Sequence, residues 1–265
     1  MLNRMIDDLI VLGLAQAVVT SLLVVVVVLV SRFQRVHLER ESAVAMLRGF
    51  VQVVAAGSVL LLLLQGPHWT SIFVLAAMMV VAARISARRA PGIDGAFWVS
   101  LQSIVVGSGL VIALMTLVGV IEADVTALIP VGSMVVAAAM RSNSQALDRF
   151  RAEVLAHTGQ IEAALALGAE PHTTVTRYVQ ASIEASLISP IDSLRSLGIV
   201  WIPGLMTGMI LSGTDPVYAA IYQFVVIAMI LAASGLTAVP AVLLVRSHVF
   251  SAAQQLVLRP GDTAV

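Results

Sequence analysis

The feature that most constrains this chain is a series of long apolar segments separated by shorter polar ones. The first runs from Leu9 to Ser31 and contains no charged residue. A helix needs roughly 20 predominantly apolar residues to cross a bilayer. Since lipid offers no hydrogen-bond partners, such spans are helices and not single strands. We therefore predict an all-α, polytopic transmembrane bundle of about seven spans, over residues 9–31, 43–64, 69–83, 96–120, 125–140, 191–212 and 217–245.

The composition supports the same fold class. Hydrophobic residues make up 59% of the 265 residues and charged residues only 11%. A soluble domain commonly has about a quarter of its residues charged, so most of this surface must face lipid. We expect residues 1–265 to form a single transmembrane domain, multi-pass in the inner or plasma membrane.

Two missing residue types exclude several functions. The chain has no cysteine, and all 15 of its basic residues are arginine. A Walker-type phosphate loop requires lysine, so we expect no ATP or Mg²⁺ cofactor in this chain and no ATPase activity. The formal net charge of +0 argues against nucleic acid as a partner, because that binding relies on excess positive charge.

The distribution of arginine predicts the orientation, because cytoplasmic loops are enriched in basic residues. Arginines gather after the first and third spans, in the 141–190 segment and in the C-terminal tail. The opposite loops contain Arg4 among acidic residues. This pattern puts the N-terminus outside and the C-terminus inside; the arginines are Arg32, Arg35, Arg40, Arg84, Arg88, Arg89, Arg141, Arg149, Arg151, Arg177, Arg246 and Arg259.

The 141–190 segment is the longest polar stretch, and we predict three helical pieces in it. Residues 144–157 continue the fifth span into the cytoplasm. Residues 160–167 form a short helix that Thr158 or Gly159 caps and that Gly168 ends. Residues 172–189 form an amphipathic helix, lying at the interface before Pro190 turns the chain into the sixth span.

The short helix carries the motif that points to a function. Glu162, Ala163, Ala164 and Gly168 follow the E-A-A-x-x-x-G pattern found in the cytoplasmic loop of ATP-binding-cassette (ABC) permeases. Small residues allow close approach to a partner, and an apolar face of Ile161, Ala164 and Leu165 can enter a groove of an ATPase subunit. The simpler alternative is a helix that packs only against its own neighbours.

Several motifs together resemble the FetB-type permease family, metal (iron) exporters of the ABC class with relatives linked to aluminium tolerance in plants. The resemblance covers Arg48 to about Phe250, and it implies a homodimer powered by a separate ATPase subunit that binds ATP and Mg²⁺. Two departures leave the substrate open: a Gly-Asn pair expected after Gly132 is missing, and Asp192 and Arg195 replace an asparagine and an apolar residue. The motifs that carry the resemblance are Arg48–Gln52, Ile129–Gly132, Ser144–Arg149, Glu162–Ala169, Pro203–Gly208, Gly213–Pro216 and Tyr222–Gln223.

Polar residues within the predicted spans are candidates for a substrate pathway, because charges in a bilayer are costly and usually functional. Asp192 and Arg195, spaced i, i+3, can form either a pathway or a structural pair. Arg48 and Gln52, spaced i, i+4, can line a pathway or anchor their helix at the interface. Each pair shares one helix face.

The sixth and seventh spans add Pro203, Met206, Thr207, Met209 and Gln223 to the pathway candidates. The Pro203–Gly204 pair predicts a kink or unwound turn, which can expose carbonyls to a cation or act as a hinge. Thioethers suit soft metals, although methionine also serves as flexible core filling. The five histidines lie in loops or at span ends, so the identity of any metal stays open.

The sequence bears on three classes of function. The motif favours an ABC permease subunit that works as a homodimer, because seven spans per chain are few for enclosing a path. An ATP-independent channel or secondary transporter is the alternative, and it needs no docking helix. An intramembrane protease is disfavoured: Gly107, Ser108 and Gly109 resemble a serine-protease motif, but no predicted span contains a histidine to activate the serine.

Overall fold

The structure is a computed structural model, which describes residues 9–33, 39–63, 69–251 and 253–258. The chain divides into two compact units, Met1–Gln65 and Gly66–Val265, and each is described by itself. The first unit contains α1 (Leu9–Phe33) and α2 (Glu39–Leu63), which contact each other. The prediction of one permease domain over the whole chain stays a prediction.

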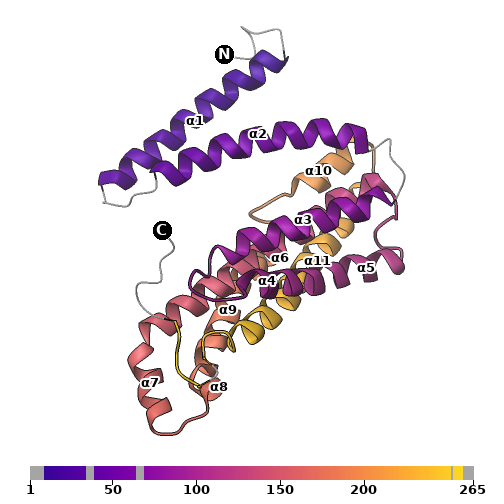
Figure 1. The fold of residues 1–265 in the computed structure, drawn as a ribbon. Helices are drawn as coiled ribbons and strands as arrows, with labels where there is room; N and C mark the ends of the chain where they lie inside the picture. Colours follow the sequence, from indigo (N-terminus) through magenta and orange to yellow (C-terminus); the bar gives the residue numbers. More distant parts are fainter. Residues whose placement is uncertain (1–8, 34–38, 64–68, 252, 259–265) are drawn as a thin grey trace. The chain divides into compact units, whose positions relative to one another are not determined.

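The second unit is built around four helical rods that lie side by side (Figure 1). These rods are α3 (Thr70–Ala87), a rod made of α4 (Ala96–Ile104), the π-helix η2 (Val105–Gly109) and α5 (Leu110–Leu117), then α6 (Val125–Ala156) and α11 (Pro216–Val245). Buried alanines let the rods approach closely, as small residues do in membrane bundles; Ala83, Ala139 and Ala233 are fully buried.

Apart from the residues buried between the rods, a cluster of buried residues lies at one end of this unit. This is the end that carries α7 (Thr158–Ala166) and α8 (Pro171–Thr174). The adjoining helix α9 (Thr176–Ser196) packs along α6 and α11. The chain after α11 folds back on this cluster: the Val257 amide donates to the Val249 carbonyl at 2.8 Å, and Leu256 and Leu258 are buried.

Two aspartates fix the starts of the longest helices. Asp124 accepts a hydrogen bond from the Ala127 amide at 3.2 Å, and Asp215 accepts from Val217 and Tyr218 amides at 2.9 and 3.0 Å. Such caps satisfy amides that have no partner inside the helix. The hydroxyl of Thr126 also donates to Asp124, and this bond is the main reason that the pKa of the Asp124 carboxyl lies below its ordinary value.

Five predicted spans are confirmed as helices. Among the described residues, five helices are long and apolar enough to cross a membrane: Ile10–Val30, Thr70–Ala87, Ala96–Leu117, Val125–Ala156 and Pro216–Val245. The long α6 also confirms the predicted helical continuation over 144–157. The described residues contain no β-strand, only isolated bridges, so the all-α fold class is confirmed. The N-outside orientation stays a prediction.

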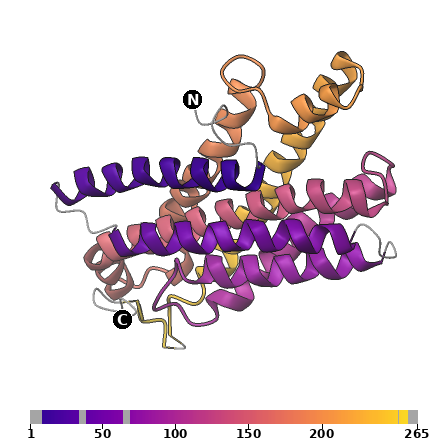
Figure 2. The ribbon, with the colours of Figure 1, turned by 90° about the horizontal axis from the view of Figure 1, so that it is seen from above.

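The two other predicted spans differ from expectation. In α2, the described apolar stretch is the shorter Ser42–Ser58. The predicted span over 191–212 is not one continuous helix: α9 ends at Ser196, residues 197–203 are not helical, and α10 (Gly204–Leu211) follows. The interruption predicted at Pro203–Gly204 is therefore present, and it is longer than expected. Figure 2 shows this non-helical loop in orange between α9 and α10.

Backbone geometry explains the break. Gly198 has a φ of +77°, a left-handed conformation that glycine adopts without strain. Pro203 has φ −70° and ψ 144°, and it lacks an amide to continue a helix. By contrast, Pro190 lies inside α9, buried among its neighbours, so the predicted turn at Pro190 is wrong. Packing along α6 and α11 keeps α9 helical through that proline.

Candidate functional site

The helix that carries the ABC-like motif is α7, and its two ends are fixed differently. It begins after His157 without a side-chain cap; Thr158 instead donates back to the Val154 and Leu155 carbonyls at 3.2 and 3.0 Å. The predicted cap at Thr158 or Gly159 is therefore wrong. The predicted end at Gly168 is confirmed: its φ is +85°, and its amide donates to the Leu165 carbonyl at 2.9 Å.

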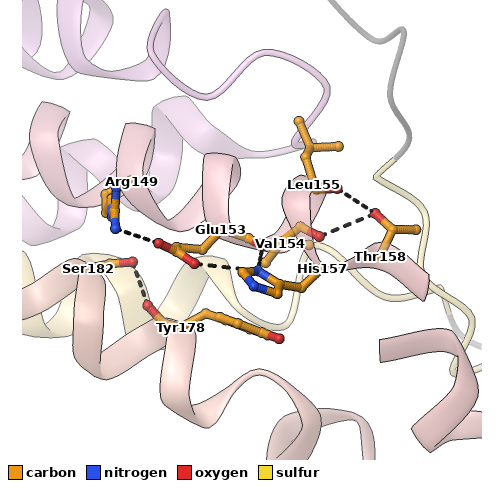
Figure 3. A network of polar contacts seen from close by, with 8 residues as sticks. All are labelled: Arg149, Glu153, Val154, Leu155, His157, Thr158, Tyr178 and Ser182. Carbon is orange, nitrogen blue, oxygen red and sulfur yellow. Dashed lines mark hydrogen bonds and ion pairs between the residues drawn. The ribbon is translucent and has the colours of Figure 1, made fainter. Parts of the chain in front are cut away.

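The corner between α6 and α7 is held by a polar network (Figure 3). Arg149 pairs with Glu153 at 2.6 Å, and the Nδ1 atom of His157 lies 3.5 Å from the same carboxylate. The His157 ring stacks on Tyr178 of α9, with 4.8 Å between ring centroids. Tyr178 is buried, and its carbonyl accepts from Ser182 at 2.5 Å.

This network ties the base of α7 to both α6 and α9. No motif pointed to this network, although Arg149, Glu153 and His157 have the i, i+4 spacing of residues that meet on one helix face. The stacking partner Tyr178 lies on a different helix, so no local pattern indicated it. A displacement of α7 would reach α6 and α9 together through these contacts.

The structure corrects the predicted docking face of α7. Ile161 is only 1% exposed and belongs to the chain's own core, and Leu165 packs against the same core. Ala164 is half-buried. Ile161 and Leu165 therefore hold α7 on its own bundle.

The opposite face of α7 is open. Glu162, Ala163, Ala166 and Gly168 are exposed, and Leu167 is 90% exposed. An open groove of about 540 Å³ lies between α7 and residues 253–256 of the chain's last segment. The residues from α7 and its end that line it are Glu162, Leu165, Ala166, Gly168 and Ala169.

The break between α9 and α10 brings together four of the predicted pathway residues. Gln223 of α11 is 1% exposed, and its Oε1 atom accepts from the Met206 amide at 3.3 Å. The Thr207 hydroxyl donates to the Pro203 carbonyl at 3.2 Å. The Nε2 atom of Gln223 is buried and finds no hydrogen-bond partner among the residues that the structure describes. Met209 lies one turn further along α10 and is half-buried.

The charged candidates lie elsewhere. Asp192 and Arg195 pair at 3.5 Å on one face of α9, with side chains 60% and 78% exposed. Arg48 and Gln52 are exposed on α2, in the other unit, and their place in a pathway stays a prediction. Within the described ranges, no three His, Asp or Glu side chains gather closely enough to hold a metal ion.

Comparison with known families covers both candidate sites. The model of an uncharacterised protein family, UPF0014, matches residues 14–250. The chain belongs to the UPF0014 family. The match extends from α1 to the turn after α11, so it includes α7 and the α9–α10 break.

Several UPF0014 relatives are similar over most of the chain. The probable iron export permease protein FetB of Escherichia coli is 31% identical over 239 residues, 89% of this chain and 92% of that protein. STAR2 of Oryza sativa is 31% identical over 92% of this chain and 86% of its own length. The ALUMINUM SENSITIVE 3 protein of Arabidopsis thaliana is 28% identical, covering 92% and 90%.

These relatives and the apolar helices establish this UPF0014 protein as a multi-pass membrane permease, similar to permeases of ABC type. The resemblance to FetB-type permeases that the motifs indicated is thereby confirmed. No solved structure gives a significant match.

The Gln223–Met206 contact gives a local prediction for this UPF0014 permease. Replacing Gln223 with leucine removes the acceptor of the Met206 amide, and an unpaired buried donor costs about 1–3 kcal/mol. We expect the first turn of α10 to open more often, so that its amides exchange with deuterium roughly 10- to 100-fold faster. Hydrogen-exchange mass spectrometry of the purified permease measures this rate.

The control for that experiment is Gln223→Glu in its protonated form, which keeps a carbonyl oxygen in place as acceptor without burying a charge. It should leave the exchange of α10 nearly unchanged. Equal exchange in the leucine and glutamate variants would mean that Gln223 does not hold α10.

Proposed function

We propose that this chain is the membrane-spanning subunit of an ABC transporter, in which two copies work with two separate ATPase subunits. The observation that carries the proposal is α7: a short helix with a fixed end, an exposed outer face and a base tied to two longer helices. An ABC permease without a phosphate loop receives its energy from a separate ATPase chain, and α7 offers that chain a rigid contact.

The path of force follows from the contacts of α7. When ATP closes the ATPase pair, the docked α7 moves with it. His157 contacts both Glu153 of α6 and Tyr178 of α9, and through these contacts the motion passes to α6 and α9. The 32-residue α6 is continuous from the corner to its outer end, so it acts as one lever. Through α9 the displacement reaches the non-helical break over 197–203.

The cargo we propose is a metal ion, iron-like, or a small metal complex, moved out of the cytoplasm. The support is the relative from Escherichia coli, whose name describes a probable iron export permease. ATP and Mg²⁺ would bind to the ATPase partner, because this chain lacks the lysine of a phosphate loop.

Co-expression with an ABC ATPase encoded beside this chain's gene tests the proposal. We expect a complex of two permeases and two ATPases to copurify, and we expect no ATP hydrolysis from the permease alone. Hydrolysis by the pure chain would contradict the proposal. Transport by the permease in ATPase-free vesicles would also contradict it, and would favour the alternative of an ATP-independent channel or secondary transporter.

A further inference from the structure

One face of α9 is polar along the length of the helix. Its members follow a spacing of three and four residues, which places them on a single face, and all are exposed. The opposite face is buried against α6 and α11. The polar residues of this α9 polar face are Arg177, Gln180, Glu184, Asp192 and Arg195, with one apolar residue, Ile188, among them.

The C-terminal half of α9 lies beside the middle of a membrane-spanning helix. Ser189, Pro190 and Ser193 share a small hollow with Ile230 and Ser234 of α11. Residues of α6 line the same hollow: Ala138, Arg141, Ser142 and Gln145. Ile230 is about 14 residues, or roughly 21 Å, from the start of α11 at a rise of 1.5 Å per residue. A bilayer core is about 30 Å thick, so this part of α9 is at membrane depth.

The hydrocarbon of a bilayer is therefore an unfavourable environment for the α9 polar face. Asp192 and Arg195, one turn from the hollow, expose most of their side chains. Charged residues at this depth face the interior of an assembly or a water-filled cavity, since exposure to hydrocarbon costs several kcal/mol.

The backbone after α9 gives an independent reason for the same surroundings. In the described segment 197–203, the amides of Gly198 and Trp201 are bonded, but the carbonyls of residues 197–200 accept no hydrogen bond within the described chain. Non-helical backbone is tolerated at membrane depth only within protein or beside water. Gln223 lies at the far side of this break, against α10. Its buried Nε2 atom has no hydrogen-bond partner within the described part of the chain.

We propose that the α9 polar faces of two copies of this chain line a shared water-filled vestibule. It runs from the α7 end of the bundle to the break over 197–203, where free carbonyls and the Gln223 amide meet a polar cargo. A two-fold axis along the membrane normal places the same residues of both copies at the same depth. Like charges then face each other, which a water-filled space accommodates better than a dry contact. The inference rests on the proposed permease function and adds which surface forms the path.

The vestibule can be mapped by cysteine labelling, since the native chain has no cysteine. Single variants Gln180→Cys, Ile188→Cys and Asp192→Cys probe the face, in permease expressed without any ATPase. Phe224→Cys and Leu236→Cys, on the exposed apolar side of α11, bracket the same depth as controls. A charged, water-soluble methanethiosulfonate measures the labelling rate in membrane fragments that are accessible from both sides. A short bis-maleimide crosslinker tests for dimers.

We expect the three α9 variants to react at least tenfold faster than the α11 controls, and Ile188→Cys or Asp192→Cys to crosslink into permease dimers. Labelling no faster than at Leu236→Cys would overturn the vestibule. Fast labelling without crosslinked dimers would contradict the proposal that a second copy forms the other wall of the vestibule. Neither readout depends on ATPase binding, so these failures are distinct from failure of the proposed coupling.

Discussion

Replacing Leu167 with glutamate will abolish ATPase docking and transport, while the permease still folds and inserts. Leu167 is 90% exposed at the end of α7, beside the turn at Gly168. A docked ATPase would cover this side chain, and an unpaired charge buried in a contact costs several kcal/mol. Every 1.4 kcal/mol is a factor of ten in affinity, so binding should weaken by more than 100-fold.

The measurement is the amount of ATPase that copurifies with the permease, together with ATP-driven transport in vesicles. Leu167→Met keeps an apolar contact and should dock normally. Ile161→Ala leaves the outer face unchanged but removes a buried side chain, so it should lower stability by about 2–5 kcal/mol instead.

Normal docking by Leu167→Glu would mean that the exposed end of α7 is not the coupling surface. Ala164 is a weaker probe of the same question, because it is half-buried against its own bundle. A charge at Ala164 would disturb the seat of α7 and the contact with the ATPase together.

The sequence predicted the membrane helices well because their signal is local. An uninterrupted apolar run such as Leu9–Ser31 needs no tertiary information to be recognised. The end of α7 at Gly168 is equally local, since glycine is the residue that accepts a left-handed turn without strain.

What the sequence did not predict depends on which surfaces meet. Periodicity places Ile161 and Leu165 on one face of α7, but it does not say whether that face meets its own core or a partner. The structure buries Ile161 in its own core. Local rules predict a helix end at Pro190, but packing on α6 and α11 keeps this proline inside α9.

The candidate site at the break was predicted only in part. The Pro203–Gly204 pair indicated an interruption, but the non-helical segment extends back to Leu197. The bond from the Met206 amide to Gln223 joins residues 17 positions apart on different helices. No spacing rule within one helix covers such a contact, because the pairing depends on how α10 folds against α11.

Gly107→Ala will destabilise the bundle more than other small changes in its helices. Gly107 lies in the π-helix η2, where the rod from α4 to α5 crosses α11. A Cβ atom added there would lie 2.0 Å from the Thr237 hydroxyl oxygen, 2.7 Å from the Thr237 amide nitrogen and 2.9 Å from its Cα. Backbone atoms cannot rotate away, so the two helices must separate.

Overpacking a well-packed core costs about 1–3 kcal/mol and occasionally more, and we expect about 3 kcal/mol here because backbone is involved. Thermal unfolding of the detergent-purified permease measures the loss. Gly109→Ala is the matched control in the same π-helix, since its nearest neighbour would be the Met79 methyl group at 3.9 Å. That variant should lie within about 0.5 kcal/mol of the native chain.

A double variant separates the hydroxyl from the backbone in this clash. Thr237→Ala removes the oxygen 2.0 Å from the added carbon but leaves the amide and Cα where they are. Combined with Gly107→Ala, it should recover part of the lost stability and not all of it, a coupling expected for residues in direct contact. Full recovery would mean that only the hydroxyl opposes a side chain at Gly107. Equal stability of Gly107→Ala and Gly109→Ala would mean that the rods are not packed this closely in the membrane.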